Sequence, residues 1–183
     1  MNEEITDADL VSRFKTESTR EKAFSEIVKK YQERLYWHIR RMVVLHEDAD
    51  DVLQNTFIKV WKGLKNFREE SQLYTWMYRI ATNETLTFLD KKKRNFSISI
   101  DDTNNTAAHS LKSDSNFDEK KAEWKLHLAI AQLPEKQRMV FNLRYFDEMP
   151  YNEMSNILQT SEGALKASFH HAVKKIEDFI LNS

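Results

Sequence analysis

The acidic segment that follows His46 is the first place where residue types and spacing could support chemistry. It contains four carboxylates, at Glu47, Asp48, Asp50 and Asp51. Imidazole and carboxylate groups bind metals, and carboxylates also act as general acids and bases. A hydrolase hypothesis therefore predicts a metal-dependent activity that Asp48→Ala abolishes. The sequence supplies no convergent nucleophile or second ligand set to complete such a site, which argues against this hypothesis.

A second candidate for metal binding is the adjacent pair His170 and His171. Neighbouring side chains on a helix point about 100° apart, and no third ligand is evident. The chain has no cysteine and only two glycines, which excludes thiolate metal sites and the usual glycine-rich phosphate loops. We expect no catalytic residue, no metal site and no cofactor, and hence a protein that is not an enzyme.

Helices must position the remaining polar side chains. Apolar residues recur at threes and fours along most of the chain, and two glycines with two prolines provide little turn chemistry for a sheet. We expect two helices between Asp7 and Val44 with a break near Glu17–Thr19, a third after the acidic segment, and a fourth from near Ser71 or Thr75 to the basic run Lys91–Arg94. The predicted fold class is all-α.

A change of composition divides the chain. Residues 95–117 are dominated by Ser, Asp, Asn and Thr and show no sustained period, which predicts a polar linker. Fully extended, this linker would span roughly 75–80 Å at ~3.3–3.6 Å per residue. We therefore expect two small helical domains, residues 1–94 and 118–183.

The C-terminal domain contains a helix-turn-helix pattern. Tyr151–Leu158 is expected to be a short helix, and Gln159–Ser161 a tight turn in which Ser161 caps the next helix. The second helix of such a pair can lie in the major groove of DNA. The N-terminus lacks the features of a signal peptide and no run approaches ~18 apolar residues, so we expect a cytoplasmic protein without direct membrane insertion.

The segment Asp48–Trp61 resembles the helix by which sigma factors of the sigma-70 family dock on the clamp of RNA polymerase. The resemblance implies that Asp48, Asp51, Gln54 and Phe57 face the polymerase, with the acids opposite basic clamp residues. For Phe57 and Trp61 a role in the hydrophobic core is the stronger expectation, whereas Gln54 has no evident core role.

Residues 67–83 resemble the loop and helix with which the same family opens and reads the minus-10 promoter element. Melting a duplex requires a place for unstacked bases, which a loop with aromatic and amide neighbours can supply. Cations nearby would pair with phosphates. The candidate DNA-binding residues here are Phe67, Arg68, Ser71, Arg79, Asn83, Lys91, Lys92, Lys93 and Arg94. The alternative is that the basic run is a solvated helix end.

Residues 133–158, with the helix that follows, resemble the second DNA-reading domain of these factors. Side chains near the N-terminus of a recognition helix reach base edges, and we take Lys166 as the best single candidate. The candidates for the minus-35 element are Ser161, Glu162, Lys166, Ala167, Ser168, His170 and Lys174.

Together these segments make the chain similar to the extracytoplasmic-function (ECF) sigma factors. That resemblance implies three partners: core RNA polymerase, through the clamp of the beta-prime subunit and the beta flap; promoter DNA; and an anti-sigma factor. The net charge of −1 fits a protein that binds DNA weakly alone. The alternative is a stand-alone helix-turn-helix regulator, which would dimerise on palindromic sites.

Overall fold

The computed structural model describes residues 5–43, 45–97 and 121–182, and within these ranges it contains eight α-helices, one short 3-10 helix and no strand. The predicted all-α class is confirmed. The elements are α1 (Asp7–Lys15), η1 (Glu17–Thr19), α2 (Arg20–Val43), α3 (His46–Leu64), α4 (Leu73–Ser97), α6 (Lys121–Ala131), α7 (Glu135–Tyr145), α8 (Tyr151–Leu158) and α9 (Glu162–Asn182). Helix α4 continues three residues into the segment expected as a linker, and the rest of that segment lies outside the described residues.

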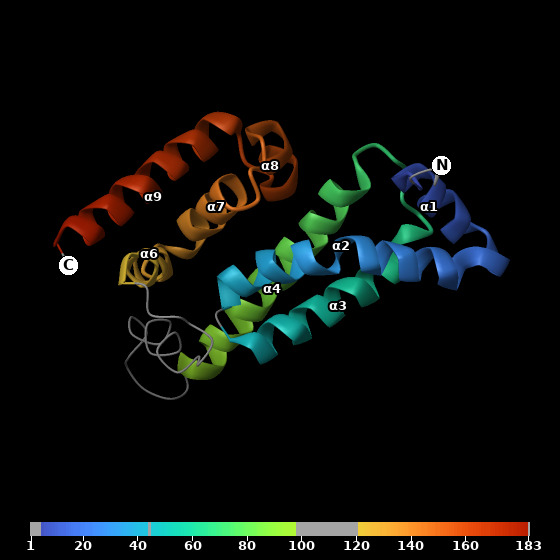
Figure 1. The fold of residues 1–183 in the computed structure, drawn as a ribbon, viewed down its shortest axis with the longest axis horizontal. Coiled ribbons are helices and arrows are strands. Elements are labelled where there is room, and N and C mark those ends of the chain that lie inside the picture. Colours follow the sequence, from blue (N-terminus) through green and yellow to red (C-terminus); the bar gives the residue numbers. More distant parts are fainter. Residues whose placement is uncertain (1–4, 44, 98–120, 183) are drawn as a thin grey trace.

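The N-terminal domain is built on the long helices α2, α3 and α4, which lie alongside one another, with α1 packed at one end (Figure 1). Their apolar stripes meet because residues three and four apart share one face of a helix. The fully buried members of this core include Leu35, Ile39 and Met42 of α2, Val60 of α3, and Met77 of α4.

Local hydrogen bonds fix where α1 begins and how it returns to α2. Thr6 caps α1 together with Asp9, and hydrogen bonds from Thr6 lower the pKa of the Asp9 carboxyl. After the break at η1, Arg13 of α1 makes two hydrogen bonds of 2.9 and 3.0 Å to Glu26 of α2. The break between Glu17 and Thr19 lies where the sequence predicted it.

The C-terminal domain consists of α6 to α9, in which α8 and α9 form the predicted helix-turn-helix. Helix α8 ends at Leu158, and the residue that caps it, Gln159, has a left-handed backbone with φ 51° and ψ 43°. The Ser161 hydroxyl accepts a hydrogen bond of 3.3 Å from the backbone N–H of Ala164, which confirms Ser161 as the cap of α9.

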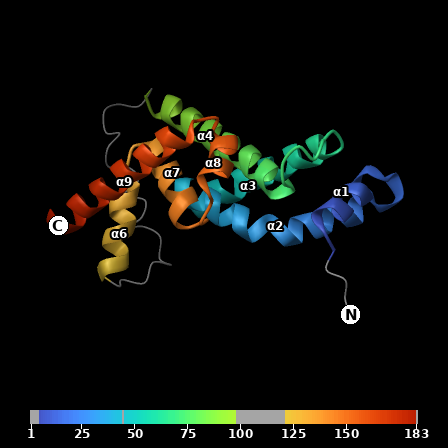
Figure 2. The same cartoon turned by 90° about the horizontal axis from the view of Figure 1, so that it is seen from above.

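The two domains pack against each other. Helix α8 lies on α4 and α7 lies on α2, and the view from above shows these pairs overlapping (Figure 2). One cluster of buried side chains runs through both domains, joining residues such as Met77 and Leu35 to Met139, Leu143 and Met154. The described chain is therefore a closed arrangement of the two domains.

Candidate polymerase and promoter interfaces

The four residues expected to face the polymerase divide into two pairs. Asp51 and Gln54 are exposed on the outer face of α3. Asp48 is half-buried, and its carboxylate accepts a hydrogen bond of 2.5 Å from Nζ of Lys92. Phe57 is half-buried and packs edge-on against another ring of the core. Only Asp51 and Gln54 therefore present unobstructed side chains to a partner.

Two apolar side chains extend the exposed face of α3. Ile58 is 45% exposed and Trp61 is 38% exposed. The spacing from Asp51 through Gln54 to Ile58 and Trp61 is three, four and three residues, which places all four on one helical face. The indole of Trp61 packs edge-on against the rings of α1 and α2 and is also partly open to solvent. The same spacing in the sequence could have identified Ile58.

The loop before α4 begins with a buried aromatic side chain and continues with exposed polar side chains. The ring of Phe67 is 8% exposed and lies 5.0 Å, centroid to centroid, from the indole of Trp76. Arg68 and Ser71, which follow in the loop, are exposed. Because so little of Phe67 is open, the structure buries this candidate against Trp76 of α4 and does not present its ring to solvent.

The candidates on α4 itself lie in two groups. Arg79 and Asn83 are exposed and, being four residues apart, share one face of the helix. In the basic run, Lys91, Lys93 and Arg94 are exposed and Lys92 is half-buried against Asp48. The ammonium group of Lys93 also forms an ion pair with Glu135 of α7.

The candidates on α9 form an exposed row. Glu162, Lys166, His170 and Lys174 repeat every four residues and are all exposed, as is Ala167, while Ser168 is half-buried. Glu162 and Lys166 form an ion pair of 3.7 Å. The ammonium group of Lys166 lies 5.5 Å from the ring centroid of Tyr151 on α8, so the first helix of the motif positions this cation.

In the acidic segment, the His46 ring pairs with two neighbouring polar side chains. His46 is hydrogen-bonded through Nδ1 to the hydroxyl of Tyr36, at 2.6 Å, and pairs through Nε2 with Asp50 at 3.4 Å. Among the described residues, no group of three or more His, Cys, Asp or Glu side chains is arranged to hold a metal ion.

Across the part of the chain that the structure describes, every helix is too short or too polar to cross a bilayer.

Comparison with known protein families divides the chain as the structure does. Residues 27–95 match the model of sigma-70 region 2, and residues 123–176 match that of sigma-70 region 4. Curated relatives match almost the full length. The ECF RNA polymerase sigma-E factor of Escherichia coli is 32% identical over 97% of this chain and 96% of its own length. The RNA polymerase sigma-H factor of Pseudomonas aeruginosa is 32% identical, over 93% and 92% respectively.

Solved structures show the same fold. CnrH, in complex with the cytosolic domain of CnrY, superimposes with a TM-score of 0.70 at 19% identity, covering 97% of this chain and 98% of that one. The sigma factor RpoE of Bartonella quintana, in complex with the anti-sigma factor NepR, gives a TM-score of 0.68 at 19% identity and covers 87% and 97%.

Two helical domains matching sigma-70 regions 2 and 4, in that order, define a promoter-specificity factor for RNA polymerase. This chain belongs to the ECF RNA polymerase sigma factors, because its relatives of that family align over nearly the whole of both chains. Its function is accordingly to direct promoter-specific initiation of transcription.

Proposed function

We propose that the exposed face of α3 binds core RNA polymerase, that the loop before α4 and α4 itself engage the minus-10 element, and that α9 engages the minus-35 element. The strongest support for this proposal is that the three helices expose different types of residue. Asp51, Gln54, Ile58 and Trp61 give α3 an acidic, amide and apolar face, while Arg79 and Lys166 belong to the faces of α4 and α9.

The face of α3 suits a protein partner. Ile58 and Trp61 offer apolar area that a docked helix can bury, and aromatic residues are enriched among the side chains that dominate binding energy. Asp51 lies on the same face, where a carboxylate favours a basic partner and speeds encounter. The clamp of the beta-prime subunit is the expected site, and the C-terminal domain would contact the beta flap.

The loop before α4 suits single-stranded DNA. Arg68 and Ser71 are exposed, and the preceding Phe67 ring is packed on Trp76, so a base extruded from the duplex would find polar contacts on a loop whose start is held by the core. Asn83 can read a base edge, while Arg79 and the cations of residues 91–94 contact phosphates.

Helix α9 suits duplex DNA. Its N-terminal turn is capped by Ser161 and carries Glu162 and Lys166 outward, in the positions from which recognition helices reach base edges. Ala167, Ser168 and His170 would contact the groove, and Lys174 a phosphate.

Residues 1–94 and 118–183 then act as two DNA-reading domains, and residues 95–117 join them. The chain contributes binding and positioning, so the chemistry of RNA synthesis stays with the polymerase and no cofactor or metal is needed here. We expect a cytoplasmic protein held in check by an anti-sigma factor, since the sigma factor RpoE, a neighbour of the same fold, was solved in complex with the anti-sigma factor NepR.

The test is reconstituted transcription with purified core polymerase on a promoter library. Initiation at a two-part motif that requires this chain is the expected result, and the double variant Asp51→Ala/Gln54→Ala should reduce it at least tenfold. The matched control is Glu21→Ala/Gln32→Ala, which removes one exposed acid and one exposed amide from α2. Specific binding to palindromic DNA without polymerase, and no initiation, would favour a stand-alone regulator.

A further inference from the structure

Helix α1 is held against the rest of the N-terminal domain along its length. At its start, the Asp7 carboxylate accepts hydrogen bonds of 2.6 Å from the Tyr31 hydroxyl and 2.7 Å from Nζ of Lys30, both on α2. Toward its end, the ring of Phe14 is 1% exposed and packs edge-on against the indole of Trp61, with 5.1 Å between the ring centroids. The residue after Phe14, which is the last of α1, therefore extends from a fixed support.

That last residue, Lys15, contacts the loop before α4. Its ammonium nitrogen lies 3.2 Å from Oε1 of Glu69, which is 54 positions further along the chain. The core holds the two ends of the loop separately, since Phe67 is 8% exposed and Leu73 is 2% exposed. Residues 68–72, between these anchors, are all exposed. Through Lys15, α1 reaches this exposed middle part of the loop.

Glu69 has a backbone conformation that its side chain disfavours. Its φ is 59°, in the left-handed region, where the Cβ atom of an L-residue lies too close to the following carbonyl oxygen. A residue keeps such a conformation where the contacts around it impose it, and such positions concentrate at functional sites. The backbone of Glu69 also sets the direction in which Glu70 and Ser71 leave. A contact that holds Glu69 therefore orients the polar residues that follow.

The charges of the loop give the same contact a second effect. Residues 65–72 contain two cations and two carboxylates. An unpaired carboxylate repels the phosphates of a strand that the loop is proposed to hold, and a paired one repels them less. Arg68 lies 3.9 Å from Glu70, and Lys15 of α1 supplies the partner of Glu69. Each acid of the loop therefore has a cation beside it.

An exposed ion pair adds little to the stability of a whole domain. The side chains of Lys15 and Glu69 are 40% and 50% exposed, so water and salt screen their attraction. Apolar packing, rather than this pair, fixes α1 and both ends of the loop. We therefore expect the pair to act on the conformation of residues 68–72 and to leave the free energy of unfolding unchanged.

We propose that Lys15 is a positioning residue for promoter recognition: by pairing with Glu69, it holds the loop before α4 in the conformation that presents Arg68 and Ser71 to an extruded base. The part of this inference that concerns DNA rests on the proposed function. The pairing and its effect on the loop are properties of the isolated chain and can be measured without polymerase or DNA.

The first experiment measures the position of the loop in the full-length chain. The protein has no cysteine, so spin labels at Gln72→Cys in the loop and Ser25→Cys on α2, both exposed, are the only ones attached. Pulsed electron spin resonance should give one narrow distance distribution. Lys15→Met removes the charge and should raise the ratio of displaced to held loop about fivefold, which is the upper end for an exposed ion pair. Lys15→Arg should restore the original distribution.

The matched control for this measurement is Lys30→Met. It removes the ion pair between Lys30 and Asp7, which also joins α1 to a neighbouring element and is similarly exposed, but which does not involve the loop. The distance distribution should stay as it is in the unaltered chain. An unchanged distribution in Lys15→Met, or an equal shift in the control, overturns the positioning role.

The second experiment measures promoter opening with core polymerase, using a fluorescent base analogue in the minus-10 element. Lys15→Met and Glu69→Gln should each slow opening about fivefold, and the double variant should be no slower than either one, because both changes remove the same interaction. Lys15→Arg should open the promoter at the original rate. If Lys15 instead bound a phosphate directly, Glu69→Gln would release it and opening would be as fast or faster, which overturns the positioning role.

The two measurements separate this inference from the proposed function. A chain whose loop is held by the pair but that never opens a promoter with core polymerase refutes the proposed function alone. A chain that opens promoters, and in which Lys15→Met changes neither the loop nor the rate, refutes the positioning role and leaves the function. Thermal unfolding checks each variant, and if Lys15→Met is destabilised, Glu69→Gln in the exposed loop gives the decisive comparison.

Discussion

Gly63 of α3 lies directly against the indole of Trp76 on α4. A Cβ atom at position 63 would lie 3.0 Å from Cζ2 and 3.3 Å from Cη2 of that ring. Trp76 in turn packs on Phe67, at the start of the loop before α4. Because Gly63 has no side chain, α3 and α4 can approach closely. This close packing holds Trp76 in place, and Trp76 in turn supports Phe67 at the start of the loop.

Replacing Gly63 by alanine should lower the free energy of unfolding by about 1 kcal/mol. Alanine favours a helix by ~1 kcal/mol over glycine, but forcing an extra carbon into a packed site costs ~1–3 kcal/mol. Urea unfolding measures the balance, and tryptophan fluorescence should report displacement of Trp76. The control is Gly163→Ala in α9, where no atom beyond the adjoining residues and the helix's own backbone lies within 4 Å of the new Cβ, and stability should rise by up to ~1 kcal/mol. Equal effects at both positions would contradict this account.

Tyr78 provides a pH-dependent measure of the packing between the two domains. Burial, followed by the negative charge of Asp147, raises the pKa of Tyr78 to about 12. An unfolded tyrosine titrates near ~10, so the stabilisation from the neutral hydroxyl is complete below about pH 10 and is lost as pH rises through the folded pKa. The free energy of unfolding should therefore fall between about pH 10 and 12.

Absorbance of tyrosinate against pH measures this ionisation. Tyr78→Phe should remove the corresponding late transition, and Asp147→Asn should move it to lower pH because the opposing charge is gone. An unchanged titration in Asp147→Asn would show that the carboxylate does not act on Tyr78 in solution.

The turn of the helix-turn-helix contains a residue in an unfavourable backbone region. Gln159 has φ 51°, where a side chain costs ~1 kcal/mol and glycine costs little. Its Nε2 donates a hydrogen bond of 2.7 Å to the carbonyl of Asn156, which recovers part of that cost. Gln159→Gly should raise the free energy of unfolding by up to ~1 kcal/mol, whereas the β-branched Gln159→Val should lower it. Thermal unfolding of both variants tests the ordering, and a more stable valine variant would contradict it.

Hydrophobic periodicity and the residues at helix ends were sufficient to predict the helices. Tyr151–Leu158 was expected as a helix and is one, and Ser161 caps α9 as its position and type predicted. Such features depend on residues close in the sequence. The left-handed backbone of Gln159 was not predicted, because no glycine or asparagine marks the position.

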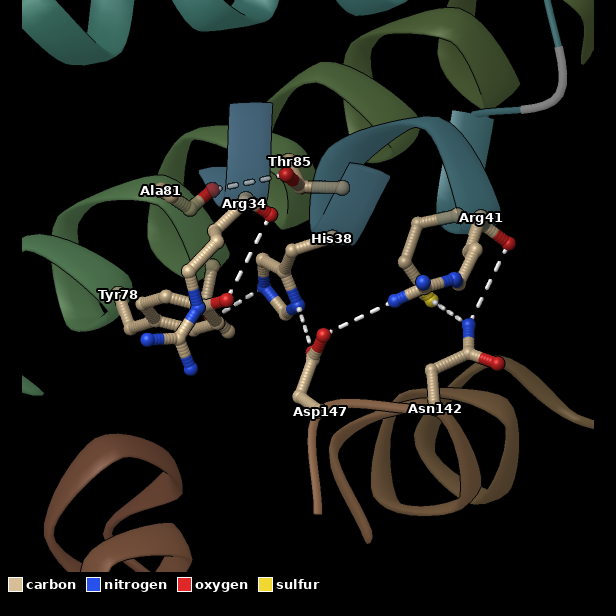
Figure 3. Close-up of polar contacts among 10 residues, drawn as sticks. Arg34, His38, Arg41, Tyr78, Ala81, Thr85, Asn142 and Asp147 are labelled. Carbon is tan, nitrogen blue, oxygen red and sulfur yellow. Dashed lines mark hydrogen bonds and ion pairs between the residues drawn. The ribbon is translucent and has the colours of Figure 1, made fainter. Parts of the chain in front are cut away.

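The contacts between the two domains could not be predicted from the sequence. Figure 3 shows one of them, between Asp147 of the C-terminal domain and His38 of α2. His38 and Asp147 are separated by 109 positions, and neither belongs to a motif that indicates the other. His38 also lies within an apolar helical stripe, where periodicity predicts only burial. The sequence favoured a core role for Trp61, and its exposure was not predicted. An indole is large enough to contact the core while one of its edges stays in solvent.

The exposed apolar part of α3 gives the sharpest prediction about polymerase binding. Ile58 is 45% exposed, so Ile58→Gln should change the free energy of unfolding by no more than ~0.5 kcal/mol. Its affinity for core polymerase should fall about tenfold, because a contact at the centre of an interface is worth ~1–2 kcal/mol. Ile5→Gln is the matched control, since Ile5 is also 45% exposed but lies before α1 and not on α3. Fluorescence anisotropy with labelled chain measures both affinities. An equal loss for both variants would show that any exposed isoleucine matters, and no loss for Ile58→Gln would place the polymerase on another face.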